Sequence, residues 1–327
     1  RVGVLGAGAW GTALAQMLAS DGRDVLLWAR RPELAAEINA CRANTRYLAG
    51  VELASTIHAT GDIGQVSDCA ILLLVTPAQH LAETLGSMPA YPRDLILCNK
   101  GIEAHSGRLM AQVAADAAPL SEVAVLSGPT FAHEVAAGLT TAVTLACGGG
   151  EEQWERLRNA IARPSFRPYY SDDVIGAEIG GAVKNVLAIA CGVVEGLDLG
   201  QNARAALIAR GYAEMLRLGD AMGASRATLA GLCGLGDLVL TCTSTSSRNF
   251  SLGAALGQGR SPQELLTHRH TVAEGAHTAP VLVALARKLA IDLPIADAVS
   301  RLLEGAPARA IVSELLARPL RAEGPSA

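Results

Sequence analysis

One stretch decides the fold: Val2-Gly3-Val4-Leu5-Gly6-Ala7-Gly8-Ala9-Trp10-Gly11. It joins an apolar run to a helical pattern through the motif G-x-G-x-x-G, and a second apolar run follows, as dinucleotide-binding loops require. Gly6 allows the tight turn, Gly8 lets the backbone approach a pyrophosphate, and Gly11 lets the helix pack against the strand. The helix N-terminus offers unpaired N–H groups and a partial positive charge to phosphates. A plain glycine turn in an α/β protein is the alternative interpretation.

Outward from this loop, short apolar runs alternate with amphipathic stretches through the first half of the chain. The run 70–75 is apolar without alternation, which is typical of a strand buried on both faces in a parallel sheet. Elements that alternate in this order predict an α/β fold with a Rossmann-type, doubly wound, mostly parallel sheet. The expected strands are 2–5, 24–28, 56–59, 70–75, 95–98, 123–126, 141–146 and 166–170, and the expected helices include 11–20, 33–40, 78–86, 107–116 and 151–162.

After about residue 172 the pattern becomes almost wholly helical. We therefore expect two domains: a dinucleotide-binding Rossmann domain over residues 1–172, and a C-terminal all-α domain over 173–327 that binds substrate and contributes catalytic groups. The tail 319–327 carries two prolines and is expected to fray. The expected helices of the second domain are 174–195, 201–222, 248–257, 274–290, 293–304 and 307–316.

The composition narrows the class of protein. The chain has 327 residues, half of them apolar, and a formal net charge of −4. Without a broad basic footprint, nucleic acid is not an expected partner. No uninterrupted apolar run is long enough for a membrane span, and the first residues are typical of a strand rather than of a signal peptide. The seven cysteines form no C-x-x-C pair and the histidines lack ligand spacing, so we expect a cytoplasmic protein without disulfides or a metal.

The second expected strand should end near the adenine ribose of a bound dinucleotide. NAD-preferring sites usually place Asp or Glu about 20 residues beyond the glycine loop, but this chain has Ala29-Arg30-Arg31 there. Two guanidiniums suit a 2′-phosphate held bidentately. The sequence therefore predicts a preference for NADP(H), with NAD(H) as the other candidate. The alternative is that Arg30 and Arg31 are solvated residues before the helix that starts near Pro32.

Lysine is rare in this chain: of 27 basic residues, only Lys100, Lys184 and Lys288 are lysines. Unlike arginine, a buried lysine can release a proton near neutral pH. Lys100 directly follows an expected strand, at the edge of the sheet where parallel sheets bind ligands. Lys184 lies on an apolar helix beside Gly180 and Gly181, where something should pack closely and poor solvation makes the lysine a candidate proton donor. A snorkelling lysine at the helix edge is the alternative.

Three further groups of polar residues follow expected strands or begin expected helices. The stretch Ser127-Gly128-Pro129-Thr130-Phe131-Ala132 offers hydroxyls and backbone to the same edge of the sheet, or is merely a turn in which Thr130 starts a helix. Asp237 and Thr241 are four residues apart and would share one face of a helix. Ser247, Arg248 and Asn249 form a cluster suited to a phosphate, although each is also an ordinary cap residue.

Taken together, these motifs resemble those of the bacterial NAD(P)-dependent glycerol-3-phosphate dehydrogenases. They occur in order along nearly the whole chain: G-A-G-A-W-G-T-A-L-A, N-T-R-Y-L-A-G, K-G-I-E, S-G-P-T-F-A, G-A-V-K-N-V, N-A-R-A-A-L-I-A-R-G, G-L-G-D-L-V-L-T-C, S-R-N-F and V-A-E-G. One departure is Thr76-Pro77-Ala78, where the family more often has Val-Pro-Ser.

The resemblance implies reversible reduction of dihydroxyacetone phosphate to sn-glycerol 3-phosphate, for phospholipid synthesis. It places the active-site lysine on Lys184, with Lys100 and Asp237 as helpers. The resemblance implies substrate contacts at Lys100, Gly128, Thr130, Lys184, Asp237, Ser247, Arg248 and Asn249. Thr241 is added to these expected contacts because it shares a helix face with Asp237. The resemblance also implies cofactor contacts at Ala9, Trp10, Arg30, Lys100, Ala132, Arg248, Val272 and Glu274. The glycines of the loop, Gly6, Gly8 and Gly11, and Arg31 are further expected cofactor contacts.

Two other functions stay open at this point. A dehydrogenase of the same architecture could act on a hydroxy acid without phosphate, which Arg248 and Asn249 argue against. A dinucleotide sensor without turnover is disfavoured by the two lysines and Asp237. A homodimer is expected, without an argument for any particular interface.

Overall fold

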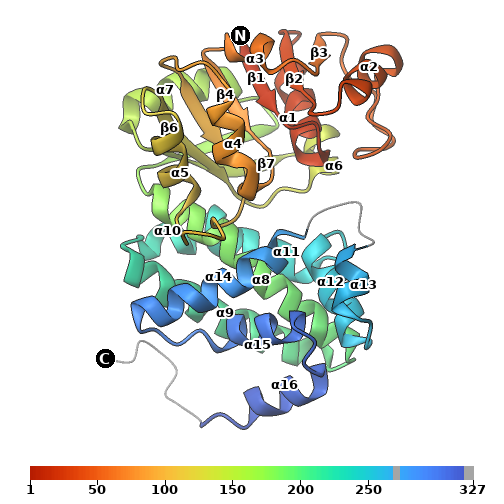
Figure 1. Cartoon of the computed structure of the whole chain (residues 1–327), viewed down its shortest axis with the longest axis vertical. Helices are drawn as coiled ribbons and strands as arrows, with labels where there is room; N and C mark the ends of the chain where they lie inside the picture. The colour runs from red at the N-terminus through yellow and green to blue at the C-terminus, as the bar shows by residue number, and fades with distance from the viewer. Residues whose placement is uncertain (268–272, 320–327) are drawn as a thin grey trace.

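The computed structural model describes residues 1–267 and 273–319, and its N-terminal part is built on one eight-stranded sheet (Figure 1). The strand order is β3-β2-β1-β4-β5-β6-β7-β8. The first six strands are parallel, β7 is antiparallel to β6, and β8 is parallel to β7. This confirms the predicted doubly wound, mostly parallel sheet, and every strand falls on an expected run: β1 Val2–Leu5, β2 Val25–Trp28, β3 Ile57–Thr60, β4 Ile71–Leu74, β5 Asp94–Leu97, β6 Glu122–Ser127, β7 Thr141–Cys147 and β8 Phe166–Ser171.

Helices cover both faces of the sheet, because successive residues of each inner strand point to opposite sides. In β4, Leu73 belongs to one buried core, whereas Leu72 and Leu74 belong to the core on the other face. The unalternated apolar run 70–75 is thus explained by burial on two faces. The helices of this part are α1 Ala9–Ala19, α2 Pro32–Cys41, α3 Ile63–Ser67, the 3₁₀ turn η1 Ala78–His80, α4 Leu81–Gly86, α5 Met110–Ala117, α6 Ala132–Ala136 and α7 Gly150–Ile161.

The C-terminal part is helical, and its longer helices lie within a few residues of the expected ranges. The short helices and the π-helical turn were not predicted, because elements of five to seven residues carry little periodicity. The helices are α8 Val174–Gly196, α9 Gly200–Met222, α10 Arg226–Ala230, the π turn η2 Leu232–Gly236, α11 Asp237–Thr243, α12 Arg248–Gly257, α13 Pro262–Thr267, α14 Glu274–Leu289, α15 Pro294–Leu303 and α16 Ala308–Leu316.

The long helix α8 lies at the centre of this part, with α9, α11, α12 and α14 packed against it (Figure 1). It is buried from Gly176 to Val194. By length and mean hydropathy α8 would also suit a membrane span, contrary to the expectation from uninterrupted runs, but 89% of its most apolar stretch is buried inside the protein. Its composition is therefore explained by its place in the core.

Glycines let α8 and α12 cross at very short distance. A Cβ atom on Gly192 would lie 2.0 Å from the carbonyl oxygen of Phe250, and one on Gly253 would lie 1.9 Å from the carbonyl oxygen of Ile189. Neither position can accept a side chain without separating the helices. This crossing fixes α12, and with it the residues at the start of α12, relative to α8.

Candidate active site

The glycine loop between β1 and α1 has the geometry that a pyrophosphate needs. Gly6 has a φ of +121°, in the region that favours glycine. A Cβ atom on Gly11 would lie 1.8 Å from the carbonyl oxygen of Gly6, so α1 approaches the turn as closely as the sequence predicts. A Cβ atom on Gly8 would meet no atom within 4 Å, and Gly8 is the N-cap of α1 without a side-chain cap. The loop therefore leaves backbone N–H groups open to a ligand, with Ala9 and Trp10 in the first turn of α1.

The two arginines after β2 differ in their surroundings. Arg30 is exposed. Arg31 donates a hydrogen bond to the hydroxyl of Tyr47 at 3.2 Å, and its guanidinium lies 5.9 Å from the centre of that ring. Arg30 is thus the more available of the two for a ligand beyond the end of β2.

Two lysines from distant parts of the chain share one carboxylate. Lys184 Nζ on α8 lies 2.5 Å from Asp237 Oδ1, and Lys100 Nζ lies 2.6 Å from Asp237 Oδ2. Lys184 also donates to Thr241 Oγ1 at 2.9 Å, one turn further along α11. Asp237 is fully buried and Lys184 is 6% exposed. The sequence places Asp237 and Thr241 on one helix face, and the structure brings that face to Lys184.

Burial sets the protonation of Lys184. Loss of hydration lowers the pKa of its ammonium group to about 8, although Asp237 opposes the shift, and the charge of Lys100 lowers the pKa further. A snorkelling lysine at the helix edge is excluded by this burial. A lysine with this pKa can both carry and release a proton near neutral pH.

Small residues allow this close assembly. A Cβ atom on Gly180 would lie 2.3 Å from the carbonyl oxygen of Cys233. A Cβ atom on Gly181 would lie 3.0 Å from Ser127 Oγ and 3.3 Å from Lys100 Cγ. The prediction that something packs closely against these two glycines is confirmed, and for Gly181 the packed group is the stem of Lys100 itself.

The end of β6 supports Lys100. Gly128 has a φ of +157°, and its carbonyl oxygen accepts hydrogen bonds from Lys100 Nζ at 3.1 Å and from Thr130 Oγ1 at 3.2 Å. Thr130 does not start the next helix: the N-cap of α6 is Phe131, and Ala132 is its first residue. The alternative of a turn capped by Thr130 is therefore wrong. Thr130 shares its acceptor, the carbonyl oxygen of Gly128, with Lys100 of the lysine cluster, which comprises Lys100, Lys184, Asp237 and Thr241.

The expected phosphate cluster lies at the start of α12. Ser247 is the N-cap, and its Oγ accepts from the N–H of Phe250 at 3.2 Å. The amide of Asn249 is engaged inside the helical part: Nδ2 donates to Asn185 Oδ1 at 2.9 Å, and Oδ1 accepts from the N–H of Gly275 at 3.0 Å. Asn249 thus fixes the start of α12 to α8 and α14, and its backbone N–H lies in the first turn.

Arg248 and Glu274 carry opposite charges beside this helix start, where Arg248 is exposed and Glu274 is half-buried. Loss of hydration at its guanidinium group lowers the pKa of Arg248, and Glu274 opposes that shift. Burial raises the pKa of Glu274, opposed by Arg248 and by a hydrogen bond from the backbone of Ala78, which follows β4. Glu274 therefore links the helical part to the sheet. Val272, also expected at the cofactor, lies outside the described residues.

Sequence reasoning missed Glu178, a buried carboxyl group on α8. Its Oε1 accepts from the backbone N–H of Ala111 at 2.8 Å, and burial raises its pKa to about 8. The sequence does carry a sign of this burial, because Glu178 is an acidic residue in an apolar helix, shortly before Gly180 and Gly181.

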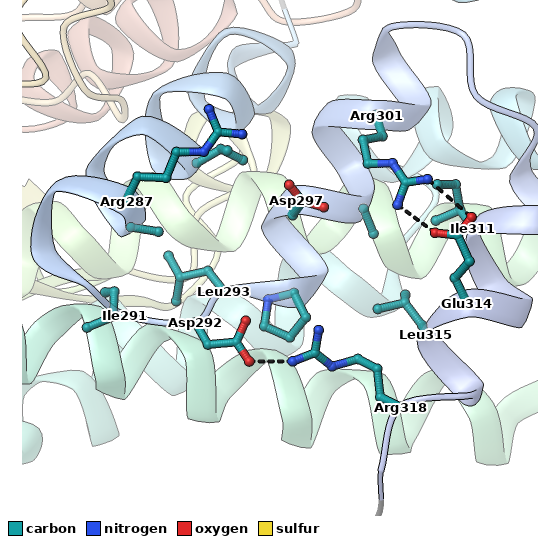
Figure 2. Close-up of a pocket in the computed structure, with 14 residues that line it drawn as sticks. Arg287, Ile291, Asp292, Leu293, Asp297, Arg301, Ile311, Glu314, Leu315 and Arg318 are labelled. Carbon is teal, nitrogen blue, oxygen red and sulfur yellow. Dashed lines mark hydrogen bonds and ion pairs between the residues drawn. The ribbon is translucent and has the colours of Figure 1, made fainter.

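One pocket lies away from these residues (Figure 2). Its volume is about 290 Å³, and it is lined by residues of α14, α15 and α16 and of the segments that follow α14 and α16. Figure 2 shows two ion pairs among its lining residues, Arg301 with Glu314 and Arg318 with Asp292, and draws no interaction for Arg287 or Asp297. It contains none of the expected site residues. The lysine cluster, where Lys184 with its lowered pKa meets Lys100 and Asp237 at the carboxyl edge of a parallel sheet, is the stronger candidate for chemistry.

The fold and the site together define an NAD(P)-dependent dehydrogenase: a Rossmann-type region with an open glycine loop, facing a helical part with a buried lysine. Comparison with known proteins narrows this class. Residues 1–153 match the family model "NAD-dependent glycerol-3-phosphate dehydrogenase N-terminus", and residues 173–313 match the corresponding C-terminus model. The chain belongs to the NAD-dependent glycerol-3-phosphate dehydrogenase family.

Individual relatives agree with this assignment. The glycerol-3-phosphate dehydrogenase [NAD(P)+] of Erythrobacter litoralis is 69% identical over 99% of this chain and 98% of the relative. A crystal structure of glycerol-3-phosphate dehydrogenase from Coxiella burnetii is similar with a TM-score of 0.92 and 40% identity, covering 97% of this chain and 98% of that one. The yeast glycerol-3-phosphate dehydrogenase structure has a TM-score of 0.81 and 26% identity, and the match covers 96% of this chain and 98% of the yeast chain.

Proposed function

We propose that this protein catalyses the reversible, NAD(P)H-dependent reduction of dihydroxyacetone phosphate to sn-glycerol 3-phosphate. The observation that carries the proposal is the buried Lys184, whose pKa is lowered to about 8 and which Asp237 and Thr241 hold in place. The names of relatives up to 69% identical over nearly the whole chain support the same reaction.

Each residue of the cluster has a distinct part in this proposal. A nicotinamide held at the glycine loop would supply the hydride that reduces the ketone carbon. Lys184 stabilises the negative charge that grows on the ketone oxygen and gives that oxygen a proton. Asp237 orients Lys184 and holds Lys100 beside it. Arg248 and the first turn of α12 bind the phosphate, and this remote binding energy orients the carbonyl group.

We propose that the chain divides into residues 1–172, which bind the cofactor, and 173–327, which provide Lys184, Asp237 and Arg248. The family models, which match 1–153 and 173–313 separately, support this division. The substrate would then lie between the two parts, since Lys100 comes from one and Lys184 from the other. Closure of the two parts on the substrate would exclude water from the reaction.

The first test follows absorbance at 340 nm with NADPH and dihydroxyacetone phosphate. Loss of absorbance is expected, and dihydroxyacetone, which lacks only the phosphate, should give little or none. Comparable turnover of the phosphate-free ketone would favour the hydroxy-acid dehydrogenase alternative. Binding of NADPH without turnover of either compound would favour the sensor alternative.

We further propose that NADPH is preferred to NADH, and that Arg30 is the main reason. Arg30 is exposed directly after β2, whereas Arg31 is engaged with Tyr47. Arg30→Ala should lower kcat/KM for NADPH on the order of ten- to a hundredfold, since hydrogen bonds to charged groups contribute about 1.5–3 kcal/mol. The value for NADH, measured with the same enzyme, should stay within error. An equal loss with both cofactors would contradict a role at the 2′-phosphate.

We also propose a cytoplasmic homodimer that makes glycerol 3-phosphate for phospholipid synthesis. The described cysteines are all free thiols and all but Cys41 are buried, which fits a reducing compartment. Light scattering tests the assembly, with a mass near twice 33.7 kDa expected for a dimer. Loss of newly made phospholipid on depletion of the protein, with rescue by added glycerol 3-phosphate, tests the role.

A further inference from the structure

Glu178 joins the active-site helix to a helix of the sheet region. It lies on α8 six residues before Lys184 and is 7% exposed. Its Oε1 accepts from the N–H of Ala111 at 2.8 Å, and the N–H of Met110 also bonds to this carboxyl group. These are the first two residues of α5. Glu178 therefore satisfies the N-terminus of a helix that belongs to the other part of the molecule.

The chain between β5 and α5 carries Lys100. It leaves the sheet after Leu97 and reaches α5 at Met110, so the Glu178 contact holds its far end against α8. Near its beginning the same segment touches α8 again, because the stem of Lys100 packs on Gly181. At this near contact, Lys100 Nζ lies 2.6 Å from Asp237 Oδ2. The position of Lys100 relative to Lys184 thus depends on where the segment 98–109 meets α8.

The surroundings of Glu178 include further polar side chains. Asn99, Ser127 and Glu178 line one small space beside Lys100 and Gly181. Each of the three has a buried polar atom without a hydrogen-bond partner in the part of the chain that the structure describes: the Asn99 amide, Ser127 Oγ and Glu178 Oε2. Buried polar atoms of this kind are costly, and each calls for a physical explanation.

We propose that Glu178 is a positioning residue that sets the Lys100 segment against α8 and so fixes the arrangement of Lys100, Asp237 and Lys184. This inference rests on the proposed function. This role requires a side chain at position 178 that is long enough to reach α5 and that carries an acceptor oxygen, but it does not require a charge. Glutamine should therefore preserve the role of Glu178, whereas alanine should not.

A matched control exists in Glu214 on α9. It is also a buried glutamate that accepts two backbone N–H groups at the start of a helix, from Ile295 at 2.7 Å and Ala296 at 3.2 Å. That helix, α15, carries none of the proposed site residues. Loss of either glutamate removes the same kind of contact, but only Glu178 lies beside the lysine cluster.

The experiment measures kcat, KM and urea stability for Gln and Ala variants at both positions. We expect Glu178→Ala to lower kcat about ten- to a hundredfold, as a misplaced catalytic group does, with KM for NADPH within about twofold. Glu178→Gln should stay within about threefold of the original kcat because its amide oxygen still accepts. Both Glu214 variants should keep kcat. Equal kcat losses in Glu178→Ala and Glu214→Ala, or a loss in Glu178→Gln as large as in Glu178→Ala, would overturn the proposal.

Two further measurements keep the test decisive. If Glu178→Ala does not fold, Glu178→Asp replaces it with the same expected loss, since it keeps the carboxyl group but shortens its reach. If the unaltered enzyme itself does not turn over dihydroxyacetone phosphate, the proposed function fails, and hydrogen exchange then decides the positioning role. Glu178→Ala should speed exchange over 98–111 and leave α12 unchanged, whereas unchanged exchange over 98–111 would overturn it.

Discussion

At the scale of single residues, the decisive feature is one carboxylate shared by two ammonium groups. Asp237 is fully buried between Lys100 and Lys184, at 2.6 and 2.5 Å. Its charge raises the pKa of Lys184, against the larger effect of burial, which lowers that pKa to about 8. The protonated form of Lys184 therefore persists through neutral pH because Asp237 is present.

Asp237→Asn should move the pH dependence of ketone reduction. Reduction needs protonated Lys184, so activity of the original enzyme should fall as pH rises through about 8. Without the carboxylate the pKa of Lys184 falls further, and the decline should begin at lower pH. The measurement is kcat/KM for dihydroxyacetone phosphate from pH 6 to 9. A decline at unchanged pH would mean that another group controls it.

Removal of Lys184 tests its catalytic part directly. Lys184→Ala should lower kcat by about a thousandfold, since general acid catalysis typically contributes 10²- to 10⁴-fold. Binding of NADPH, followed by fluorescence, should persist because the glycine loop is untouched. Lys288→Ala removes the exposed lysine of α14 and should change neither quantity. Near-normal turnover in Lys184→Ala would refute the assignment.

The sequence alone predicts part of this site. A lysine in an apolar helix predicts the burial of Lys184, and the spacing of Asp237 and Thr241 predicts their shared face. The bond between Lys100 and Asp237 joins residues 137 positions apart, and no local pattern encodes it. The same holds for Asn249, whose amide is bonded to Asn185 and Gly275. Contacts that depend on the packing of two parts can only be seen after folding.

At the scale of secondary-structure elements, the crossing of α8 and α12 limits what can replace its glycines. Gly192→Ala should destabilise the protein by about 1–3 kcal/mol, because overpacking costs more than the gain in helix propensity, which is about 1 kcal/mol. Its Cβ would lie 2.0 Å from the carbonyl oxygen of Phe250. Gly86→Ala is the control, because a Cβ there meets no atom within 4 Å in α4. Urea midpoints of the two variants should differ clearly, and equal midpoints would contradict this interpretation.

The strands were predicted more completely than the helices. An apolar run such as Ile71–Leu74 has the same appearance wherever it is buried, and all eight strands fall on expected runs. Short helices such as α3, α6 and α10 owe their stability to tertiary contacts and to N-caps. In α3, for example, the Asp62 side chain accepts a hydrogen bond from the N–H of Gly64. The π turn η2 brings the Cys233 carbonyl against Gly180, a packing constraint that the local sequence does not reveal.

At the scale of the whole molecule, two buried glutamates make stability depend on pH. Burial raises the pKa of Glu178 to about 8 and that of Glu214 to about 7, from 4.5. The native state therefore binds more protons than the unfolded state over this range, and stability falls as pH rises from about 5 to 8. Each group can contribute at most about 1.4 kcal/mol per pH unit.

Glu214→Gln isolates this effect without touching the lysine cluster. The free energy of unfolding in urea, measured at pH 5.5 and pH 8, should differ less for the variant than for the original protein. Other titrating groups change equally in both proteins, so they cancel in this comparison. An identical pH dependence in the two proteins would show that Glu214 keeps an ordinary pKa in the folded state.

The core helix α8 also has a consequence for how the protein is made. A nascent chain that has just completed α8 lacks α12 and α14, which cover that helix in the finished protein. Until those helices are made, α8 is an uncovered 23-residue segment whose mean hydropathy would suit a membrane span. Lysine near the middle of such a helix disfavours insertion by about 2.5–3.5 kcal/mol. Lys184, a residue that we assign to catalysis, therefore also makes α8 a poorer membrane-spanning segment than its mean hydropathy alone would suggest.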